Sequence, residues 1–148
     1  MSDNDVAVFF YGLFMDESLL TSRGIDPSDT TVGFVDGYRL RIGKRATLVP
    51  EQASRAYGVL MTIGRDEATA LYADASLADY VPEPVSVTLP SGVIESAICY
   101  NLPPGALEGA NSAYAESLLL LAKRLGFPDE YLDTIRTETN PGQANVGN

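Results

Sequence analysis

The first apolar run of the chain lies close to its start and does not alternate. Residues 6–11 are apolar or aromatic at every position, which is typical of a strand covered on both faces. Gly12 follows, and Asp16 and Glu17 then open a short segment, 16–22, that we expect to be helical. The pattern predicts a central strand, a glycine turn and a short helix.

Further along, apolar and polar positions alternate, as they do in half-buried strands. We expect a bulge at Asp36 and Gly37, where an acidic residue interrupts the apolar side. Pro50 should end one short strand, and Pro90-Ser91-Gly92 is typical of a hairpin turn. Strands are predicted over residues 32–42, 46–49, 55–63, 81–89 and 93–101.

Apolar residues at helical spacing predict helices over 65–73 and 112–125, and a third that begins at Pro128. Residues 1–138 are expected to form one domain, and residues 139–148, which are polar and contain glycine, a disordered tail. The order of elements predicts an α+β fold. Its sheet should be mixed, mostly antiparallel and barrel-like, with helices at its edges.

Composition limits the setting of the chain. It has 148 residues, of which 45% are hydrophobic, enough for one core. Its apolar runs are far shorter than the ~20 residues that span a bilayer, and its first residues are acidic, unlike those of a signal peptide. We therefore expect a cytoplasmic protein without a membrane partner.

Charge and the absence of histidine exclude several kinds of chemistry. Twenty acidic and ten basic residues give a formal charge of −10, which would repel a nucleic acid. Without histidine there is no Ser-His-Asp triad and no partner to activate the lone Cys99, and most zinc sites are excluded. Acid–base chemistry would have to use carboxylates, tyrosines or lysines.

The turn after the first strand is the first candidate site. A strand that ends at a glycine and opens into a helix leaves backbone N–H groups unpaired, and these can hold a carboxylate or a carbonyl oxygen. An ordinary strand-to-helix connection has the same sequence features, so the turn alone does not establish a site.

Three motifs, in order, cover nearly the whole chain. The first is Tyr11-Gly12-Leu13-Phe14-Met15, and the second runs from Leu71-Tyr72-Ala73-Asp74 to Tyr80 at the start of a strand. The third consists of Asn111-Ser112-Ala113-Tyr114 and the later Gly126-Phe127-Pro128-Asp129-Glu130-Tyr131. Together they resemble the gamma-glutamylcyclotransferase-like family, whose fold is a small mixed-sheet barrel with flanking helices.

The resemblance implies a reaction and its requirements. A gamma-glutamyl amine or peptide would cyclise, with release of 5-oxoproline and a free amine, without metal or cofactor. A carboxylate would carry a proton from the substrate ammonium to the leaving nitrogen, while backbone donors hold the substrate. The implied partner is this small-molecule substrate, and a homodimer is also compatible with the sequence.

The resemblance also assigns residues to the substrate-binding part of the site. Leu13 stands where the family has a serine or threonine, so the loop keeps a backbone N–H but lacks a hydroxyl. Tyr100 resembles a tyrosine that lines the family's pocket, and otherwise is a core aromatic. The substrate-binding residues implied are Tyr11, Gly12, Leu13, Phe14, Met15 and Tyr100.

Two carboxylates are candidates for the proton carrier. The family's glutamate lies between the positions of Tyr72 and Tyr80, where this chain has only Asp74 and Asp79. Asp74 is the closer match but one methylene shorter, and it is otherwise an ordinary aspartate in a loop after a helix. Glu83 shares a strand face with apolar residues, and is otherwise a carboxylate that reaches water or pairs with Arg39, Arg41 or Arg45.

These residues support two main functions. The chain is a cyclotransferase in which Asp74 or Glu83 carries the proton, or it binds a small acidic metabolite in the same pocket and has lost the proton carrier. An interaction protein without a ligand is a third option. The first two differ in whether a carboxylate faces the Tyr11–Met15 loop.

Overall fold

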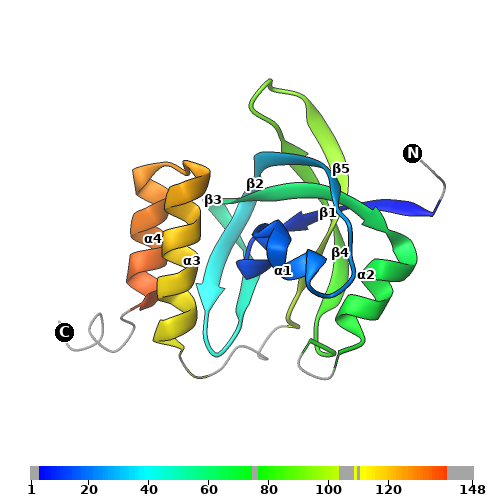
Figure 1. The fold of residues 1–148 in the computed structure, drawn as a ribbon. Helices are drawn as coiled ribbons and strands as arrows, with labels where there is room; N and C mark the ends of the chain where they lie inside the picture. The colour runs from blue at the N-terminus through cyan, green and yellow to red at the C-terminus, as the bar shows by residue number, and fades with distance from the viewer. Residues whose placement is uncertain (1–3, 75–76, 104–108, 110, 140–148) are drawn as a thin grey trace.

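Five strands close into a barrel in the computed structural model, which describes residues 4–74, 77–103, 109 and 111–139 (Figure 1). Around the barrel the order is β1, β3, β2, β4, β5. The α+β class and the barrel-like mixed sheet with flanking helices are thus confirmed. The strands are β1 (Asp5–Phe10), β2 (Ser28–Ile42), β3 (Ala46–Gly64), β4 (Val81–Thr88) and β5 (Ile94–Asn101).

β1 lies between β3, to which it is antiparallel, and β5, to which it is parallel. Val8, Phe9 and Phe10 are all buried, although consecutive side chains point to opposite faces of a strand. The prediction of a strand covered on both faces is therefore confirmed. Because β1 is held on both sides, the loop that follows it starts from a fixed point.

β2 and β3 form a long antiparallel hairpin with two irregularities, of which the first lies between Ser28 and Thr31. Their register shifts a second time between Asp36 and Tyr38, where Gly37 adopts a φ of 85°, so the predicted bulge is confirmed. The prediction that Pro50 ends a strand is wrong, because β3 continues through it to Gly64. Pro50 lies opposite Tyr38 at the bulge, where the ladder is already disrupted and a missing N–H costs little.

The helices flank the barrel (Figure 1). α3 and α4 lie side by side at one end of the hairpin, and Gly126 ends α3 with a left-handed φ of 80°. Thr139, which was expected in the tail, is the last residue of α4, and the rest of the expected tail, 140–148, lies outside the described residues. The helical elements are η1 (Leu13–Met15), α1 (Glu17–Thr21), α2 (Arg65–Tyr72), α3 (Ser112–Leu125) and α4 (Asp129–Thr139).

Aromatic rings join the helical pair to the barrel. The ring of Tyr57 on β3 lies 5.6 Å from that of Phe127 and 5.1 Å from that of Tyr131, measured between centroids. These contacts hold the connection between α3 and α4, and the start of α4, against the sheet, while Tyr114 in the first turn of α3 reaches the loop after β1. None of the described helices is both long and apolar enough to cross a membrane.

Candidate functional site

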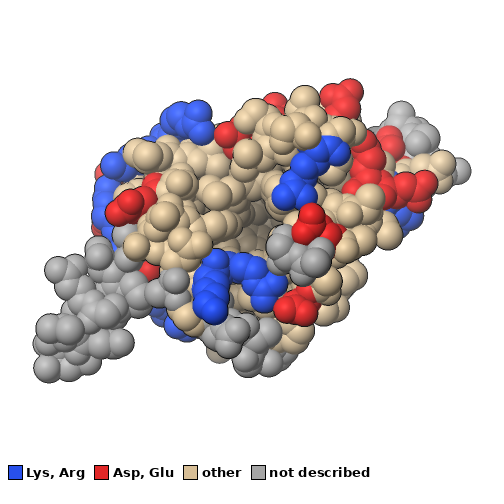
Figure 2. All heavy atoms as spheres, turned by 60° about the horizontal axis from the view of Figure 1, so that its bottom comes forward, with Lys and Arg blue, Asp and Glu red and all other residues tan. Residues whose placement is uncertain are grey.

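A cavity of about 220 Å³ lies where the loop after β1 meets the start of α3 and the segment before β4. Figure 2 looks toward this end of the barrel and shows a hollow surrounded mostly by uncharged residues, with both basic and acidic side chains near its mouth. We call this cavity the aromatic pocket. Its lining consists of Phe9, Phe10, Tyr11, Gly12, Leu13, Phe14, Leu19, Arg45, Ala46, Tyr72, Leu77, Tyr80, Tyr100 and Tyr114.

The structure brings most of the predicted substrate-binding residues together. Four residues of the loop, Tyr11 to Phe14, line the aromatic pocket, and so does Tyr100 from β5. Met15 does not line it; its side chain is 3% exposed in the core, and its N–H donates to the carbonyl of Gly12. The Met15 side chain therefore supports the loop from behind.

The close approach of Tyr114 explains the glycine in the loop. A Cβ at position 12 would overlap the Tyr114 hydroxyl oxygen. That oxygen accepts a hydrogen bond of 3.3 Å from the Leu13 N–H. A backbone donor predicted to hold an anion is thus already bonded to a phenol, which can in turn donate its own proton to a guest.

Three further tyrosines form one wall of the aromatic pocket. The rings of Tyr72 and Tyr100 are stacked, with centroids 3.8 Å apart and planes 9° apart, and Tyr80 lies 5.9 Å from Tyr72. Tyr80 donates its hydroxyl hydrogen to the carbonyl of Ala46, and Tyr11 donates its own to the carbonyl of Tyr100 at 2.7 Å. These two phenols therefore position the wall rather than point freely into the cavity.

Tyr72, Tyr80 and Tyr114 belong to the motifs that carry the family resemblance, yet they were not expected as pocket residues. They come from α2, the residue before β4, and α3, and sequence spacing does not show that all three line one cavity. The available signal was the presence of these tyrosines in the second and third motifs.

The phenols in the aromatic pocket are neutral at neutral pH, and burial makes their ionisation harder still. Desolvation raises the pKa of Tyr11 and Tyr72 well above the usual value of 10, and it also raises the pKa of Tyr80, Tyr100 and Tyr114. Burial disfavours the phenolate because its charge loses water. At neutral pH these side chains are hydrogen-bond donors and not bases.

Arg45, from the turn between β2 and β3, is the one charged residue among the described residues that line the aromatic pocket. Its guanidinium carbon lies 5.5 Å from the centre of the Tyr80 ring, and its Nη2 lies 3.2 Å from Asp79 Oδ2. In the sequence Arg45 was considered only as a partner of Glu83. Its place in the pocket depends on how the hairpin folds over the barrel end.

Asp74 does not line the aromatic pocket. It follows α2, its side chain is 45% exposed, and its Oδ2 lies 3.6 Å from Arg23 Nη1. This placement agrees with the alternative in which Asp74 is an ordinary aspartate after a helix. Its catalytic role stays a prediction without support from the described geometry.

Glu83 does not line the aromatic pocket either. Its Oε1 accepts a hydrogen bond of 2.9 Å from Asn101 Nδ2, and the amide oxygen of Asn101 accepts the Leu48 N–H at 3.3 Å. Glu83 therefore joins a polar network between β3, β4 and β5. As with Asp74, its catalytic role stays a prediction.

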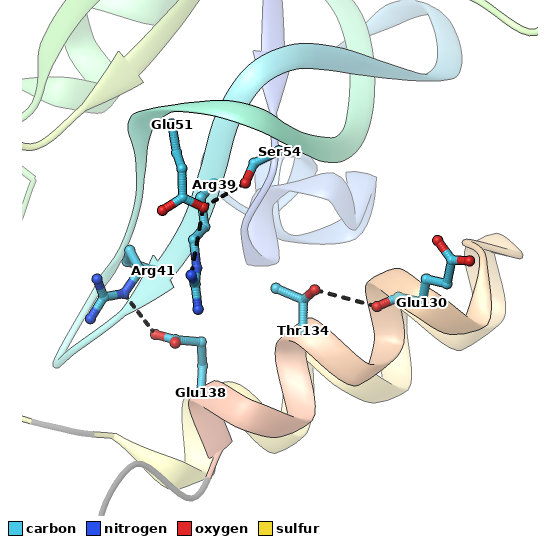
Figure 3. Close-up of polar contacts among 7 residues, drawn as sticks. All are labelled: Arg39, Arg41, Glu51, Ser54, Glu130, Thr134 and Glu138. Carbon is cyan, nitrogen blue, oxygen red and sulfur yellow. Dashed lines mark hydrogen bonds and ion pairs between the residues drawn. The ribbon is translucent and has the colours of Figure 1, made fainter. Parts of the chain in front are cut away.

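The three arginines considered as partners of Glu83 pair with other acids. Arg45 pairs with Asp79, as described above. Arg39 lies 3.5 Å from Glu51, and Arg41 lies 3.5 Å from Glu138 (Figure 3). Glu83 is thus held by an amide and not by these arginines.

A second hollow, of about 800 Å³, lies between the β2–β3 hairpin and α4, and we call it the charged groove. Figure 3 shows its polar contacts: Glu51 accepts a hydrogen bond from Ser54 and pairs with Arg39, and Thr134 donates to the backbone carbonyl of Glu130. Arg55, which also lines it, pairs with Asp36 at 2.6 Å. These charged groups already satisfy one another and remain open to solvent.

No family model matches the chain, and no curated protein matches it in sequence. Solved structures do share its architecture. A gamma-glutamyl cyclotransferase superposes with a TM-score of 0.74 at 17% identity, over 90% of this chain and 88% of that one. YkqA from Bacillus subtilis superposes with a TM-score of 0.74 at 21% identity, over 93% of this chain and 55% of YkqA.

An AIG2-like protein from Mus musculus is more distant, with a TM-score of 0.54 at 14% identity over 74% of this chain and 90% of that one. The TM-scores of all three indicate a shared overall fold. The chain has the gamma-glutamylcyclotransferase-like fold, as its motifs predicted.

Proposed function

We propose that the chain binds a small acidic metabolite in its aromatic pocket and does not cyclise a gamma-glutamyl group. The observation that carries this proposal is that neither Asp74 nor Glu83 lines the pocket, while Arg45 does. The pocket also lies at the loop that the family resemblance assigns to substrate binding. An arginine beside a neutral phenol such as Tyr114 can hold an anion, because both groups donate hydrogen bonds.

Cyclisation needs a general base such as a carboxylate, and no described residue that lines the aromatic pocket carries one. A base must take a proton from the substrate ammonium and return it to the leaving nitrogen, and it works best with a pKa near the working pH. The phenols of Tyr72, Tyr80 and Tyr114 have a raised pKa and hold their protons at neutral pH. The lining can therefore orient a guest but does not move a proton readily.

The size of the aromatic pocket limits the guest. Its volume of about 220 Å³ is below the roughly 300–1,000 Å³ of pockets that take drug-sized ligands. A single small metabolite fits this space better than a gamma-glutamyl peptide with a long second residue.

A cyclotransferase is the second candidate, and one observation favours it: the likeness to a solved gamma-glutamyl cyclotransferase over 90% of the chain. In that case a carboxylate must reach the cavity beside Gly12 and Leu13 when substrate is bound. Asp74, which follows α2, would be the closer match in sequence.

Two measurements on the purified chain test the proposal together. Isothermal titration calorimetry with glutamate, 5-oxoproline and phenylacetate measures binding, and incubation with a series of gamma-glutamyl amines and peptides measures 5-oxoproline release. The proposal expects an acid to bind and no 5-oxoproline to form. Release that is lost in Asp74→Asn or Glu83→Gln would instead establish the cyclotransferase and the carboxylate that serves it.

A further inference from the structure

The walls of the aromatic pocket narrow the class of its guest. Seven of the lining residues are aliphatic or phenylalanine, and the charged member among the described ones is Arg45. We infer that the guest is an apolar monocarboxylate, an aromatic or branched aliphatic acid, rather than an amino acid. This inference rests on the proposed function and specifies its ligand. The seven residues are Phe9, Phe10, Leu13, Phe14, Leu19, Ala46 and Leu77.

Arg45 is the anchor for the carboxylate of such a guest. Its side chain is 32% exposed and that of its partner Asp79 is 69% exposed. Exposed ion pairs contribute little because water screens them. A guest carboxylate can replace Asp79 or share the guanidinium with it, since an arginine presents five N–H donors in a planar fork.

The uncharged part of the guest would lie against aromatic rings. Tyr72 stacked on Tyr100 presents a flat wall, and Phe14 packs edge-on against Phe10 with centroids 6.1 Å apart. Flat apolar groups gain both from the area that they bury and from ring-to-ring contact. The Tyr114 hydroxyl can donate to the second carboxylate oxygen.

An amino acid would bring an ammonium group into the same space. A cation taken out of water needs an acid or several carbonyl oxygens as partners. No described residue that lines the aromatic pocket is acidic. The carbonyls of Ala46 and Tyr100 already accept hydrogen bonds from Tyr80 and Tyr11. The site can therefore accommodate the negative half of a zwitterion but not the positive half.

Three probes of similar shape separate these contributions in calorimetric titrations of the full chain. Phenylacetate carries only the carboxylate, phenylacetamide is its neutral counterpart, and phenylalanine adds an ammonium group. We expect phenylacetate to bind about tenfold or more tightly than either of the other two, as the loss of a charge-assisted hydrogen bond implies. Phenylalanine or glutamate binding as tightly as phenylacetate would overturn the inference and leave the proposed function intact.

Variants locate the anchor. Arg45→Gln should weaken phenylacetate binding about tenfold or more, Arg45→Lys should weaken it less because it keeps the charge, and Asp79→Asn should strengthen it because a competing carboxylate is removed. The matched control is Arg55→Gln. Arg55 likewise lies over an aromatic ring, 3.8 Å from the centre of Phe34, and pairs with an exposed aspartate, but it lines the charged groove.

Each result of this series decides between clear alternatives. Phenylacetate binding that falls in Arg45→Gln and persists in Arg55→Gln supports the inference. Equal binding by Arg45→Gln and the unchanged chain would overturn it, because the carboxylate would then be held elsewhere. Failure of every acid in the series to bind would refute the proposed function itself.

Discussion

The aromatic pocket and the charged groove differ in how their polar groups are used. The groove is more than three times as large, about 800 Å³ against 220 Å³, but its two arginines already pair with exposed acids of the groove. The pocket has few polar groups, set among rings, and these converge on one space. Small-molecule sites usually combine apolar walls with a few placed polar groups, so the smaller hollow is the better candidate.

An arginine over an aromatic ring occurs in both places. Arg45 lies over Tyr80 and pairs with Asp79, and Arg55 lies over Phe34 and pairs with Asp36. The residue types therefore do not distinguish the two hollows. What distinguishes them is the rest of the lining: Arg45 stands beside a mostly apolar and aromatic cavity, whereas Arg55 stands among other charged residues.

Substitution of a glycine in each hollow tests this comparison, and the largest effect is expected at Gly12 in the aromatic pocket. Gly12→Val should abolish phenylacetate binding and lower the free energy of unfolding by about 1–3 kcal/mol, because the new side chain overlaps the Tyr114 hydroxyl. Calorimetry and urea denaturation measure the two effects. Unchanged binding in Gly12→Val would show that the loop is not part of the site.

Gly37→Ala in the charged groove is the control for that variant. Nothing lies within 4 Å of a Cβ at position 37, but the φ of 85° is unfavourable for alanine. We expect a loss of about 1–2 kcal/mol in stability without any loss of binding.

The second-largest effect is expected at alkaline pH, where the buried phenols of the aromatic pocket should make the stability of the fold depend on pH. Burial raises the pKa of Tyr72 in the folded chain above the value near 10 that applies when it is unfolded. The unfolded chain therefore loses this proton first, and stability falls as pH rises above about 10, by up to about 1.4 kcal/mol per pH unit for each such phenol. Below pH 10 this contribution is fully present.

Urea denaturation at pH 9, 10.5 and 11.5 measures this slope, and Tyr72→Phe should reduce it. Glu51 in the charged groove should have the opposite pH dependence, because its contribution to stability is lost toward acid pH. A hydrogen bond from Ser54 lowers the pKa of Glu51, so its small contribution is present above about pH 4.5 and is lost as pH falls further. An alkaline slope that Tyr72→Phe leaves unchanged would show that Tyr72 does not contribute to it.

The smallest effects should come from removing one hydroxyl in each hollow. Tyr114→Phe leaves the Leu13 N–H without its acceptor, and we expect a loss of about 1 kcal/mol in stability together with weaker phenylacetate binding. Tyr131 lies at the charged groove, and its buried hydroxyl has no hydrogen-bond partner among the described residues.

Tyr131→Phe is therefore the matched control for Tyr114→Phe. Because no bond is lost, its free energy of unfolding should be unchanged or slightly higher. Thermal denaturation of the two variants beside the unchanged chain makes the comparison. Equal losses of stability in the two variants would mean that the hydrogen bond from the Leu13 N–H to the Tyr114 hydroxyl does not contribute to stability.

Much of the fold could be predicted because it follows local patterns. The non-alternating run of β1, the glycine at the β2 bulge and the glycine that ends α3 each have a direct local reason. Pro50 was misjudged because a proline ends a strand only where its N–H is needed by a partner. That depends on the register between β2 and β3.

The candidate site was predictable only in part. The Tyr11–Phe14 loop could be found because it is contiguous in the sequence and adjacent to a strong strand signal. Asp74 was proposed from its place in the second motif and Glu83 from its strand face, and the structure places neither of them in the lining of the aromatic pocket. Which way a loop or strand side chain faces relative to a cavity depends on how the barrel closes.

The sequence by itself determined most of the strands and helices, the glycine turn and the fold class, because periodicity and backbone preference act within a few residues. Only the tertiary structure decided what faces the turn. Tyr114 meets Leu13 across 101 positions, and Arg45 arrives from a hairpin turn. Closure of the five strands brings these distant groups together, and it directs Asp74 and Glu83 to other partners.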